Sequence, residues 1–264
     1  MLTNPRSDRV KAVRALSRRS ARERSGRFVA DGPQAVREAV AYAGAGLLDL
    51  YVTQEGQRRH PGLVESARAA GRHVHEVTDD VLVAMSETGA PQGLLAVCRR
   101  PDATLEQVLA AAPRLLVLLA NVRDPGNAGT VIRGADAAGA DAVLVSDASV
   151  DVYAPKAVRS TAGSAFHLPV VTGLDVAATV AALRAHGIRV LAADGAGSTL
   201  LPDADLTGPH AWLLGNEAWG LSEETRSLAD DVVRVPILGR AESLNLAMAA
   251  TVCLYASAAV IAPH

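Results

Sequence analysis

Cysteine is nearly absent from this chain, since only Cys98 and Cys253 occur among 264 residues. Two cysteines are too few for a disulfide framework or a cysteine-based metal cluster, so we expect both to be small buried hydrophobic residues. The seven histidines do not follow metal-ligand spacing, although His60, His73 and His75 lie in one region. We therefore predict no metal site.

Long uncharged apolar runs are also missing. The one candidate is the Ala-rich C-terminal stretch, which Asn245, Thr251, Tyr255 and Ser257 interrupt. A helix that spans a bilayer needs about 20 predominantly apolar residues, so we do not expect this stretch to cross a membrane. The N-terminus is basic and has no apolar signal core, which favours a cytoplasmic protein.

The net charge of −2 conceals an uneven distribution. Residues 1–100 carry 16 Lys and Arg against 11 Asp and Glu, a net charge of +5, whereas residues 101–264 carry 10 against 17, a net charge of −7. The pattern predicts one basic helix over residues 6–27, with an apolar face and with Lys11, Arg14 and Arg18 among its exposed cations. Such a helix indicates a polyanionic partner bound by charge. A merely solvated basic helix is the alternative.

Apolar segments alternate with helical patterns along the whole chain, which predicts an α/β protein. We expect a small α/β domain in residues 1–100, a linker in residues 101–112 and a larger domain in residues 113–264. The larger domain should have a mostly parallel sheet with helices on both faces. Its expected strands lie near residues 115–120, 142–146, 166–171, 188–193, 211–215 and 232–236. Its expected helices lie near residues 127–138, 154–160, 175–186, 222–229 and 243–260.

Three polar stretches directly follow predicted strands of the larger domain. Residues 121–139 contain a turn, a helix for which Asn127 is the expected N-cap, and the cation Arg133. The other two are residues 213–222 (LLGNEAWGLS) and residues 235–250 (VPILGRAESLNLAMAA). Because α/β proteins place ligand loops at the carboxyl ends of parallel strands, we expect these stretches to form one site.

Each stretch also has a simpler interpretation when taken alone. Arg133 is then a solvated helix residue, and Glu217 caps a helix, although Ser222 already fits that role. N-capping explains Ser243 but not Asn245, which is expected inside the first helical turn. Residues 191–199 (LAADGAGST) lack the G-x-G-x-x-G fingerprint of a dinucleotide site.

Asn127 with Arg133, then Gly215-Asn216-Glu217, then Ser243-Leu244-Asn245, resemble in this order the three motifs of the SpoU (TrmH-type) RNA ribose methyltransferases of the SPOUT superfamily. The resemblance covers residues 115–260, and residues 10–100 are similar to the family's substrate-binding domain. It implies S-adenosylmethionine as cofactor, a C-terminal trefoil knot and a homodimer formed through the knot region. By this resemblance the catalytic residues are Arg133, Asn127, Glu217, Ser243 and Asn245. The implied cofactor-binding residues are Ala193, Gly195, Leu214, Gly215, Asn216, Val235, Ile237, Leu238 and Leu244. Arg159 is the implied RNA contact, in addition to Lys11, Arg14 and Arg18.

The resemblance implies methylation of a ribose 2′-hydroxyl, and we expect the substrate to be 23S ribosomal RNA. The alternative substrate is transfer RNA. The alternative classes of protein are a non-catalytic RNA-binding protein that keeps the fold and a Rossmann-type nucleotide enzyme. A guanidinium stays protonated, so Arg133 is expected to orient the substrate and stabilise negative charge on the 2′-oxygen. An RNA phosphate or water would take the proton. The chain has only two Trp, two Phe and four Tyr, so we do not expect an aromatic platform for bases.

Overall fold

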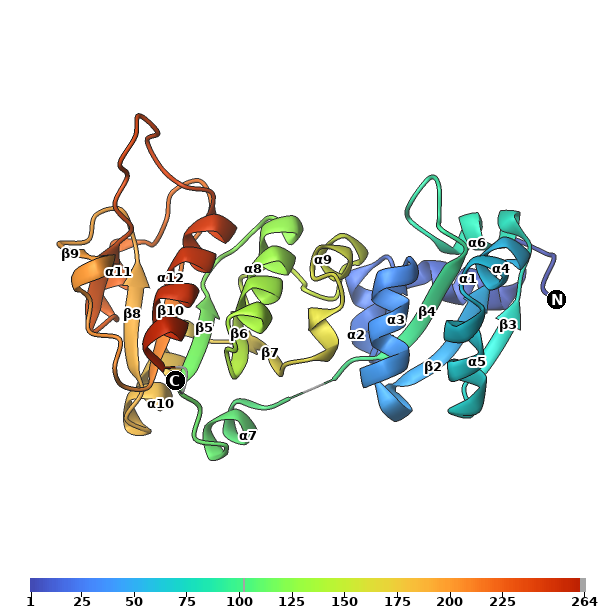
Figure 1. Ribbon diagram of the computed structural model, residues 1–264, viewed down its shortest axis with the longest axis horizontal. Helices are drawn as coiled ribbons and strands as arrows, with labels where there is room; N and C mark the ends of the chain where they lie inside the picture. Colours follow the sequence, from blue (N-terminus) through green and yellow to red (C-terminus); the bar gives the residue numbers. More distant parts are fainter. Residues whose placement is uncertain (102, 262–264) are drawn as a thin grey trace. The chain divides into compact units, whose positions relative to one another are not determined.

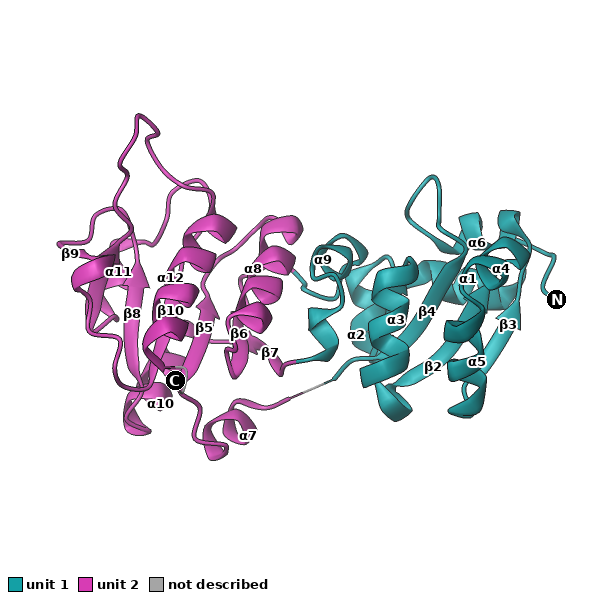
Figure 2. Ribbon diagram, in the orientation of Figure 1, with its two compact units in different colours: residues 1–101, 151–167 teal, residues 102–150, 168–264 magenta. Residues whose placement is uncertain are grey.

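The computed structural model describes residues 1–101 and 103–261. The chain forms two compact units (Figure 2). The N-terminal unit consists of residues 1–101 and 151–167, and the C-terminal unit consists of residues 102–150 and 168–264. The N-terminal unit therefore includes a segment from the middle of the chain. No helix within residues 1–101 and 103–261 has both the length and the apolar character that a bilayer span requires.

A four-stranded sheet forms the centre of the N-terminal unit (Figure 1). Its strands lie in the order β1 (Arg27–Asp31), β4 (Leu94–Arg99), β2 (Leu47–Val52) and β3 (His73–Glu76). β4 is antiparallel to both neighbours, whereas β2 and β3 are parallel. One face packs against α1 (Asp8–Ala15) and α6 (Asp79–Met85). The remaining helices of this unit are α2 (Arg19–Ser25), α3 (Pro33–Tyr42), α4 (Gln54–Arg59), α5 (Pro61–Ala69) and, from the middle of the chain, α9 (Pro155–Ser160).

The basic N-terminal segment forms two helices, α1 and α2, so the prediction of a single helix over residues 6–27 was wrong. Arg22 provides the physical reason, because its side chain is buried and must find acceptors. Its guanidinium donates to the carbonyls of Leu16 and Ser17, at 2.7 Å each, and to the Asp151 carboxylate at 2.8 Å. These two carbonyls are available because the chain turns between α1 and α2.

The C-terminal unit contains a seven-stranded sheet in the order β7-β6-β5-β10-β8-β11-β9, and every described pairing is parallel. This arrangement confirms the predicted parallel sheet. The strand expected at 166–171 was misplaced, because a 3-10 turn covers Ser164–Phe166 and the strand begins at Val170. The strands are β5 (Leu115–Leu119), β6 (Ala142–Ser146), β7 (Val170–Leu174), β8 (Arg189–Ala193), β9 (Thr199–Leu200), β10 (His210–Leu214) and β11 (Asp231–Arg234).

Helices cover both faces of this sheet (Figure 1). α7 (Leu105–Ala110) and α10 (Val176–Ala185) contribute to the core on one face, as do Leu221 and Leu228, which flank α11 (Glu223–Ser227). α8 (Pro125–Ala137) and α12 (Leu246–Ile261) pack against each other and against the other face. Val and Leu residues of β5, β6 and β10 are buried from both sides, as expected for central parallel strands.

A buried polar network attaches α12 to β10. The indole of Trp212 donates to the Ser257 hydroxyl at 2.9 Å, and His210 Nε2 lies 2.7 Å from the same oxygen. His210 Nδ1 lies 2.8 Å from the Gly208 carbonyl, which can only accept, so Nδ1 carries a proton; the Ser257 hydroxyl also donates to the Cys253 carbonyl at 3.2 Å. Burial lowers the pKa of His210 below its ordinary value, and the Gly208 carbonyl opposes this shift. His210 therefore has a structural role, since it links β10 to α12 through Ser257.

Candidate active site

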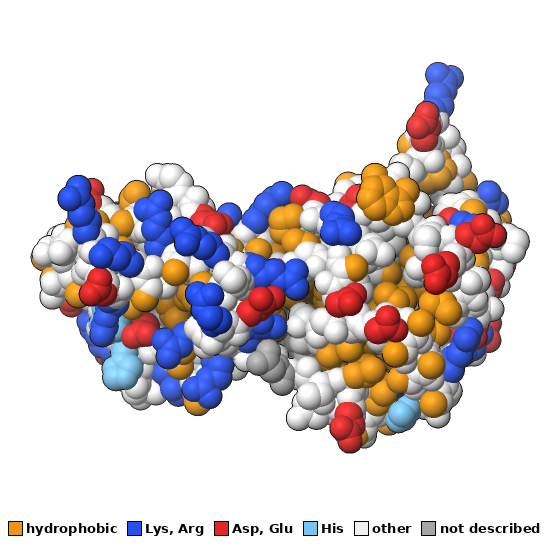
Figure 3. Space-filling model, turned by 180° about the vertical axis from the view of Figure 1, so that it is seen from behind, with side chains coloured by type: hydrophobic (Ala, Val, Ile, Leu, Met, Phe, Trp, Pro, Cys, Tyr) orange, Lys and Arg blue, Asp and Glu red, His pale blue; other side chains and the backbone are white. Residues whose placement is uncertain are grey.

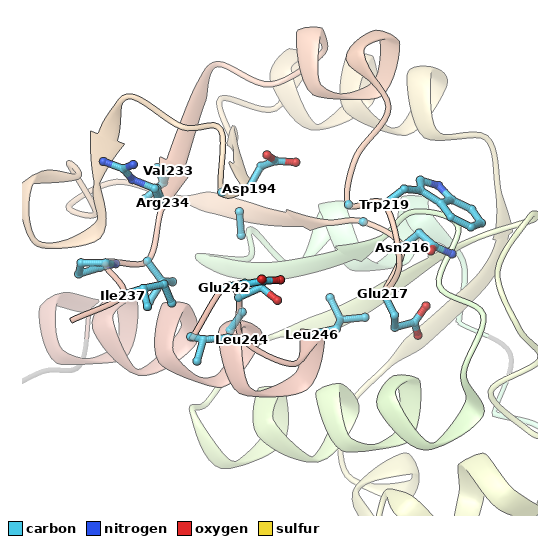
Figure 4. Close-up of a pocket in the computed structure, with 18 of the residues that line it drawn as sticks. Asp194, Asn216, Glu217, Trp219, Val233, Arg234, Ile237, Glu242, Leu244 and Leu246 are labelled. Carbon is cyan, nitrogen blue, oxygen red and sulfur yellow. The ribbon is translucent and has the colours of Figure 1, made fainter. Parts of the chain in front are cut away.

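A cavity of about 600 Å³ lies at the carboxyl ends of β8, β10 and β11 (Figure 4). Its walls come from the loops after these strands and from the first turn of α12. Seven predicted cofactor residues line it, namely Ala193, Gly195, Gly215, Asn216, Val235, Ile237 and Leu244. The structure does not bring the other two into the lining, since Leu214 is buried in β10 and Leu238 is 95% exposed.

The loop after β10 is a tight and internally bonded turn. The N–H groups of Asn216 and Gly220 each donate to the other residue's carbonyl at 2.9 Å. A Cβ at Gly215 would lie 2.5 Å from Gly220 backbone atoms, so this position requires glycine. The Asn216 side chain accepts from the Ala218 N–H at 2.8 Å and donates to the Asn121 carbonyl at 2.9 Å. The turn is therefore rigid and is joined to the loop after β5.

The Glu217 carboxylate holds the start of α8. Its Oε2 accepts from the backbone N–H of Arg123 at 3.1 Å, and its Oε1 accepts from that of Asp124 at 3.0 Å. Negative charge is favourable at a helix N-terminus. The alternative role of capping α11 does not apply to Glu217, because Ser222 is the N-cap of that helix.

The prediction that Asn127 is an N-cap was wrong. Asp124 is the N-cap of α8, and its carboxylate accepts from the Asn127 N–H at 2.8 Å. Pro125 takes the first helical position, where its missing N–H costs nothing. The Asn127 side chain is thereby available for bonds to other loops.

Asn127 connects the three predicted motifs. Its Nδ2 donates to Glu217 Oε1 at 3.3 Å, and its Oδ1 accepts from Asn245 Nδ2 at 3.0 Å. Asn245 Oδ1 in turn accepts from the Ala247 N–H at 2.9 Å. α12 begins at Leu246, so the expectations that this helix starts at Ser243 and contains Asn245 were wrong. Ser243 lines the cavity, and Asn245 precedes the helix and binds Asn127.

Arg133 lies apart from this network. It is exposed on α8, outside the cavity lining, and within the described part of the chain it has no hydrogen bond or ion pair. The neighbouring Gly134 faces α12, where an added Cβ would lie 2.9 Å from Thr251 Oγ1. The fold of one chain therefore does not bring Arg133 to the cavity.

The predicted RNA contacts all belong to the N-terminal unit. Lys11, Arg14 and Arg18 are exposed, and Lys11 pairs with Asp8 at 3.2 Å. Arg159 lies on α9, and its Nη1 is buried without a hydrogen-bond partner among the described residues. The segment that carries Arg159 thus packs against β1, in the same unit as the basic N-terminal residues, although it is distant in sequence.

Asp194 is a site residue that the sequence interpretation missed. Its carboxylate accepts from the N–H groups of Ala196 at 2.9 Å and Leu221 at 3.3 Å, and it lies 3.6 Å from Arg226 Nη1. It therefore joins the loop after β8 to the turn after β10. The available signal was an acid directly after a predicted strand, between two residues that were already assigned to the site.

The cavity combines negative charge with apolar walls. Three acidic residues (Asp194, Glu217 and Glu242) line it with one cation, Arg234, and with the apolar Val233 and Ile237 (Figure 4), so its lining carries more negative than positive charge. Such a lining fits an organic ligand that carries positive charge. Among the residues described, no group of three His, Cys, Asp or Glu side chains is placed to hold a metal ion.

The fold and the site define an α/β protein that binds an organic ligand at the carboxyl ends of parallel strands. Residues 114–255 match the model of the SpoU rRNA Methylase family, and residues 7–96 match an MRM3-like substrate binding domain. The chain belongs to the SpoU rRNA methylase family.

Similar proteins extend over nearly the whole chain. The 23S rRNA (guanosine(2553)-2′-O)-methyltransferase RlmP of Bacillus subtilis is 34% identical over 96% of this chain and 97% of its own length. The 23S rRNA (uridine(2479)-2′-O)-methyltransferase of Streptomyces viridochromogenes is 37% identical over 91% of this chain and 85% of its own length. The crystal structure of the SpoU methyltransferase AviRb from S. viridochromogenes with the cofactor AdoMet is 33% identical, with a TM-score of 0.83 and coverage of 96% and 98%.

Proposed function

We propose that this protein transfers the methyl group of S-adenosylmethionine to a ribose 2′-hydroxyl of 23S ribosomal RNA. The hydrogen-bond chain Glu217–Asn127–Asn245 carries the proposal, because it joins the loop after β10, the first turn of α8 and the segment before α12 beside one cavity. The family membership and the names of the related enzymes support both the reaction and the RNA class. Transfer RNA is the alternative substrate.

The cavity suits the cofactor in size and in chemistry. Its volume of about 600 Å³ lies in the range of small-molecule sites. Asp194 and Glu242 offer negative charge to the cationic groups of S-adenosylmethionine, and Val233 and Ile237 offer apolar walls. When bound, the cofactor supplies a methyl group on a positively charged sulfur.

The side chains of the network position the substrate rather than transfer a proton. Glu217 uses its carboxylate oxygens on Arg123, Asp124 and Asn127, so it holds the loop after β5 in place. Arg133 would stabilise the negative charge that develops on the ribose 2′-oxygen. A nearby phosphate of the RNA or a water molecule would accept the proton. Fixed positioning of the hydroxyl provides much of the acceleration.

A homodimer formed along α12 would explain the position of Arg133. α12 exposes Met248, Val252 and Tyr255, which recur at helical spacing and form an apolar stripe beside α8. A second copy on this stripe would lie next to Arg133. The arginine would then serve the cavity of the partner. Mixing an Arg133→Ala variant with a Gly215→Ala variant tests this idea, because mixed dimers would regain one intact site and measurable activity.

The N-terminal unit is the proposed RNA-binding domain. It carries 18 Lys and Arg against 12 Asp and Glu, and Figure 3 shows many of these cations over its surface. Arg27 and Arg99 lie directly opposite each other on β1 and β4, an arrangement that like charges disfavour. Neither has an ion-pair partner among the described residues, and an RNA phosphate between them would relieve their repulsion. Lys11, Arg14, Arg18 and Arg159 remain proposed contacts of the same kind.

Three further predictions remain proposals. We propose domains at residues 1–100 and 113–264 with a linker at residues 101–112. Residues 102 and 262–264 lie outside the described structure, and residues 151–167 of the proposed larger domain pack in the N-terminal unit. The family matches to residues 7–96 and 114–255 support this division. A C-terminal trefoil knot is proposed from the family resemblance. The insertion of β10 between β5 and β8 and the return of α12 onto α8 support it. A cytoplasmic location is also still a prediction.

Transfer of labelled methyl groups to total RNA from a host that lacks this protein tests the proposed function. Label in 23S RNA with wild-type protein, and its loss with Arg133→Ala, is the expected result. Label in transfer RNA would overturn the substrate assignment and preserve the reaction. The absence of label from all RNA, with cofactor binding demonstrated, would overturn the reaction.

A further inference from the structure

We propose that Trp219 is a stacking platform for the nucleobase of the nucleotide that is methylated. This inference rests on the proposed function and goes further, because it assigns a residue that contacts the base. It also revises the expectation that this chain, with its few aromatic residues, has no aromatic platform for bases.

Trp219 is unusually exposed for its size. Its side chain lines the cavity and is 67% exposed, whereas Trp212, the other tryptophan of the chain, is 0% exposed. Among the described residues, the other strongly exposed aromatic side chains have contacts of their own. The Tyr42 ring packs edge-on against His167 at 4.6 Å, and the Tyr255 hydroxyl donates to the Ala137 carbonyl at 3.4 Å. Trp219 is therefore the exposed aromatic that is placed to receive a ligand.

The backbone that carries Trp219 is rigid. Trp219 lies in the turn between Asn216 and Gly220, and two backbone hydrogen bonds between these residues close the turn. The buried Asn216 side chain braces the turn through Ala218 and through the loop after β5. A side chain on such a support loses little conformational freedom when it binds, which favours stacking.

The location of Trp219 points to the substrate rather than to the cofactor. Figure 4 shows Trp219, Asn216 and Glu217 at one end of the cavity and Ile237 and Arg234 at the other. Glu217 belongs to the network that would position the ribose hydroxyl. The base is attached directly to that ribose, and Trp219 lies in the same turn as Glu217. We therefore expect the base to lie beside the indole.

The charge around Trp219 favours a base over a phosphate. Glu217 is the next residue but one before Trp219 in the chain, and its carboxylate would repel an anion, whereas Arg234, the cation in the lining, lies at the opposite end of the cavity (Figure 4). A nucleobase has an uncharged π-face that stacks on an indole, and this stacking tolerates any base. Trp219 would therefore strengthen RNA binding without selecting a particular nucleotide.

Tryptophan fluorescence tests the platform directly, because Trp212 is buried and acrylamide quenching then reports on Trp219. The protein is saturated with S-adenosylhomocysteine and titrated with transcribed 23S RNA, with RNA retention on filters as an independent measure of binding. We expect RNA to shield the accessible tryptophan from acrylamide, and Trp219→Phe to remove this signal. Unchanged quenching with RNA demonstrably bound would overturn the proposal. Full shielding by S-adenosylhomocysteine alone would also overturn the proposal and would show that Trp219 covers the cofactor. Full shielding on raising the protein concentration alone would overturn it in favour of a contact between two copies of the chain.

Steady-state kinetics provides the second test. Stacking on one base corresponds to roughly a 5- to 150-fold effect on binding. Trp219→Leu should raise the KM for RNA by a factor in this range and leave the KM for S-adenosylmethionine unchanged, and Trp219→Phe should retain most of the wild-type value. Trp219→Phe is the matched control, because it keeps an aromatic ring at the same position. A change confined to the KM for S-adenosylmethionine would overturn the platform. If wild-type protein transferred no methyl group, the proposed function would fail, and the fluorescence test would still decide the role of Trp219.

Discussion

Replacing Glu217 by glutamine should weaken methyl transfer and leave the shape of its pH dependence unchanged. The carboxylate accepts bonds from the backbone N–H groups of Arg123 and Asp124 and from the Asn127 side chain. Glutamine has the same length but offers one oxygen and one NH₂ group. Either orientation sets an NH₂ donor against at least one N–H donor of the loop after β5.

The size of the effect follows from these bonds. A hydrogen bond to a charged acceptor contributes about 1.5–3 kcal/mol, whereas a neutral one contributes about 1 kcal/mol. Glutamine would lose one hydrogen bond and weaken the others. The stabilisation of the loop after β5 would therefore fall by about 3 kcal/mol before solvent screening is considered. Because Glu217 is partly exposed, we reduce this figure to about 2 kcal/mol. If the loop must be ordered for reaction, kcat/KM should fall roughly 30-fold.

The assay is methyl transfer over a range of pH with wild type, Glu217→Gln, Asn127→Ala and the double variant. If Glu217 positions Asn127, the two substitutions should be non-additive by at least about 0.5 kcal/mol. A general base in this position would instead remove the rising limb of the pH–rate profile when it is replaced by glutamine. Loss of that limb, additivity of the two changes, or activity within twofold of wild type would refute the positioning role.

Three other substitutions or conditions give distinct expectations. Gly215→Ala should weaken S-adenosylmethionine binding at least tenfold, measured by calorimetry, because the new Cβ would lie 2.5 Å from backbone atoms of Gly220. Gly208→Ala is the control, because its new Cβ would have no atom within 4 Å among the described residues, and this variant should bind the cofactor normally. Burial lowers the pKa of His210, so the unfolded chain binds the proton more readily and stability should fall as the pH drops below about 6.5. Urea unfolding at several pH values measures this loss, which a His210→Gln variant should not show. Arg22→Ala should cost about 3 kcal/mol in urea unfolding, because it removes the ion-pair partner of the largely covered Asp151 carboxylate, which within the described structure keeps only the Tyr153 N–H as a donor. Arg19→Ala, which removes an exposed ion pair, should cost less than about 1 kcal/mol.

The order of secondary-structure elements was accessible from the sequence because it depends on local patterns. Apolar runs such as residues 115–119 have the length and aliphatic content of a strand buried on both faces, and the structure places β5 there. Polar loops after such strands predicted one shared site, since parallel strands end at one edge of a sheet. Seven predicted cofactor residues indeed line one cavity.

The errors in the sequence interpretation share a cause. Asn127 is a residue type that favours the N-cap position, but Asp124 takes that role, and the Asn127 amide bonds to residues distant in sequence. The helix expected over residues 6–27 breaks because Arg22 is buried against Asp151, which lies 129 residues further on. Local propensity could not reveal either partner.

The amino-acid sequence by itself determined the α/β class, the parallel sheet, the family and the positions of three site loops. Hydrophobic periodicity depends on neighbouring residues, and the order of the motifs can be read directly along the chain. Only the tertiary structure decided which atoms meet. It assigned the Glu217 carboxylate to N–H groups more than 90 residues away, brought Asp194 into the site and left Arg133 outside the cavity of its own chain. It also left the Trp219 indole exposed on a rigid turn while it buried Trp212. Hydrogen-bond partners and exposure depend on how distant strands and loops are brought together, and no local pattern contains that information.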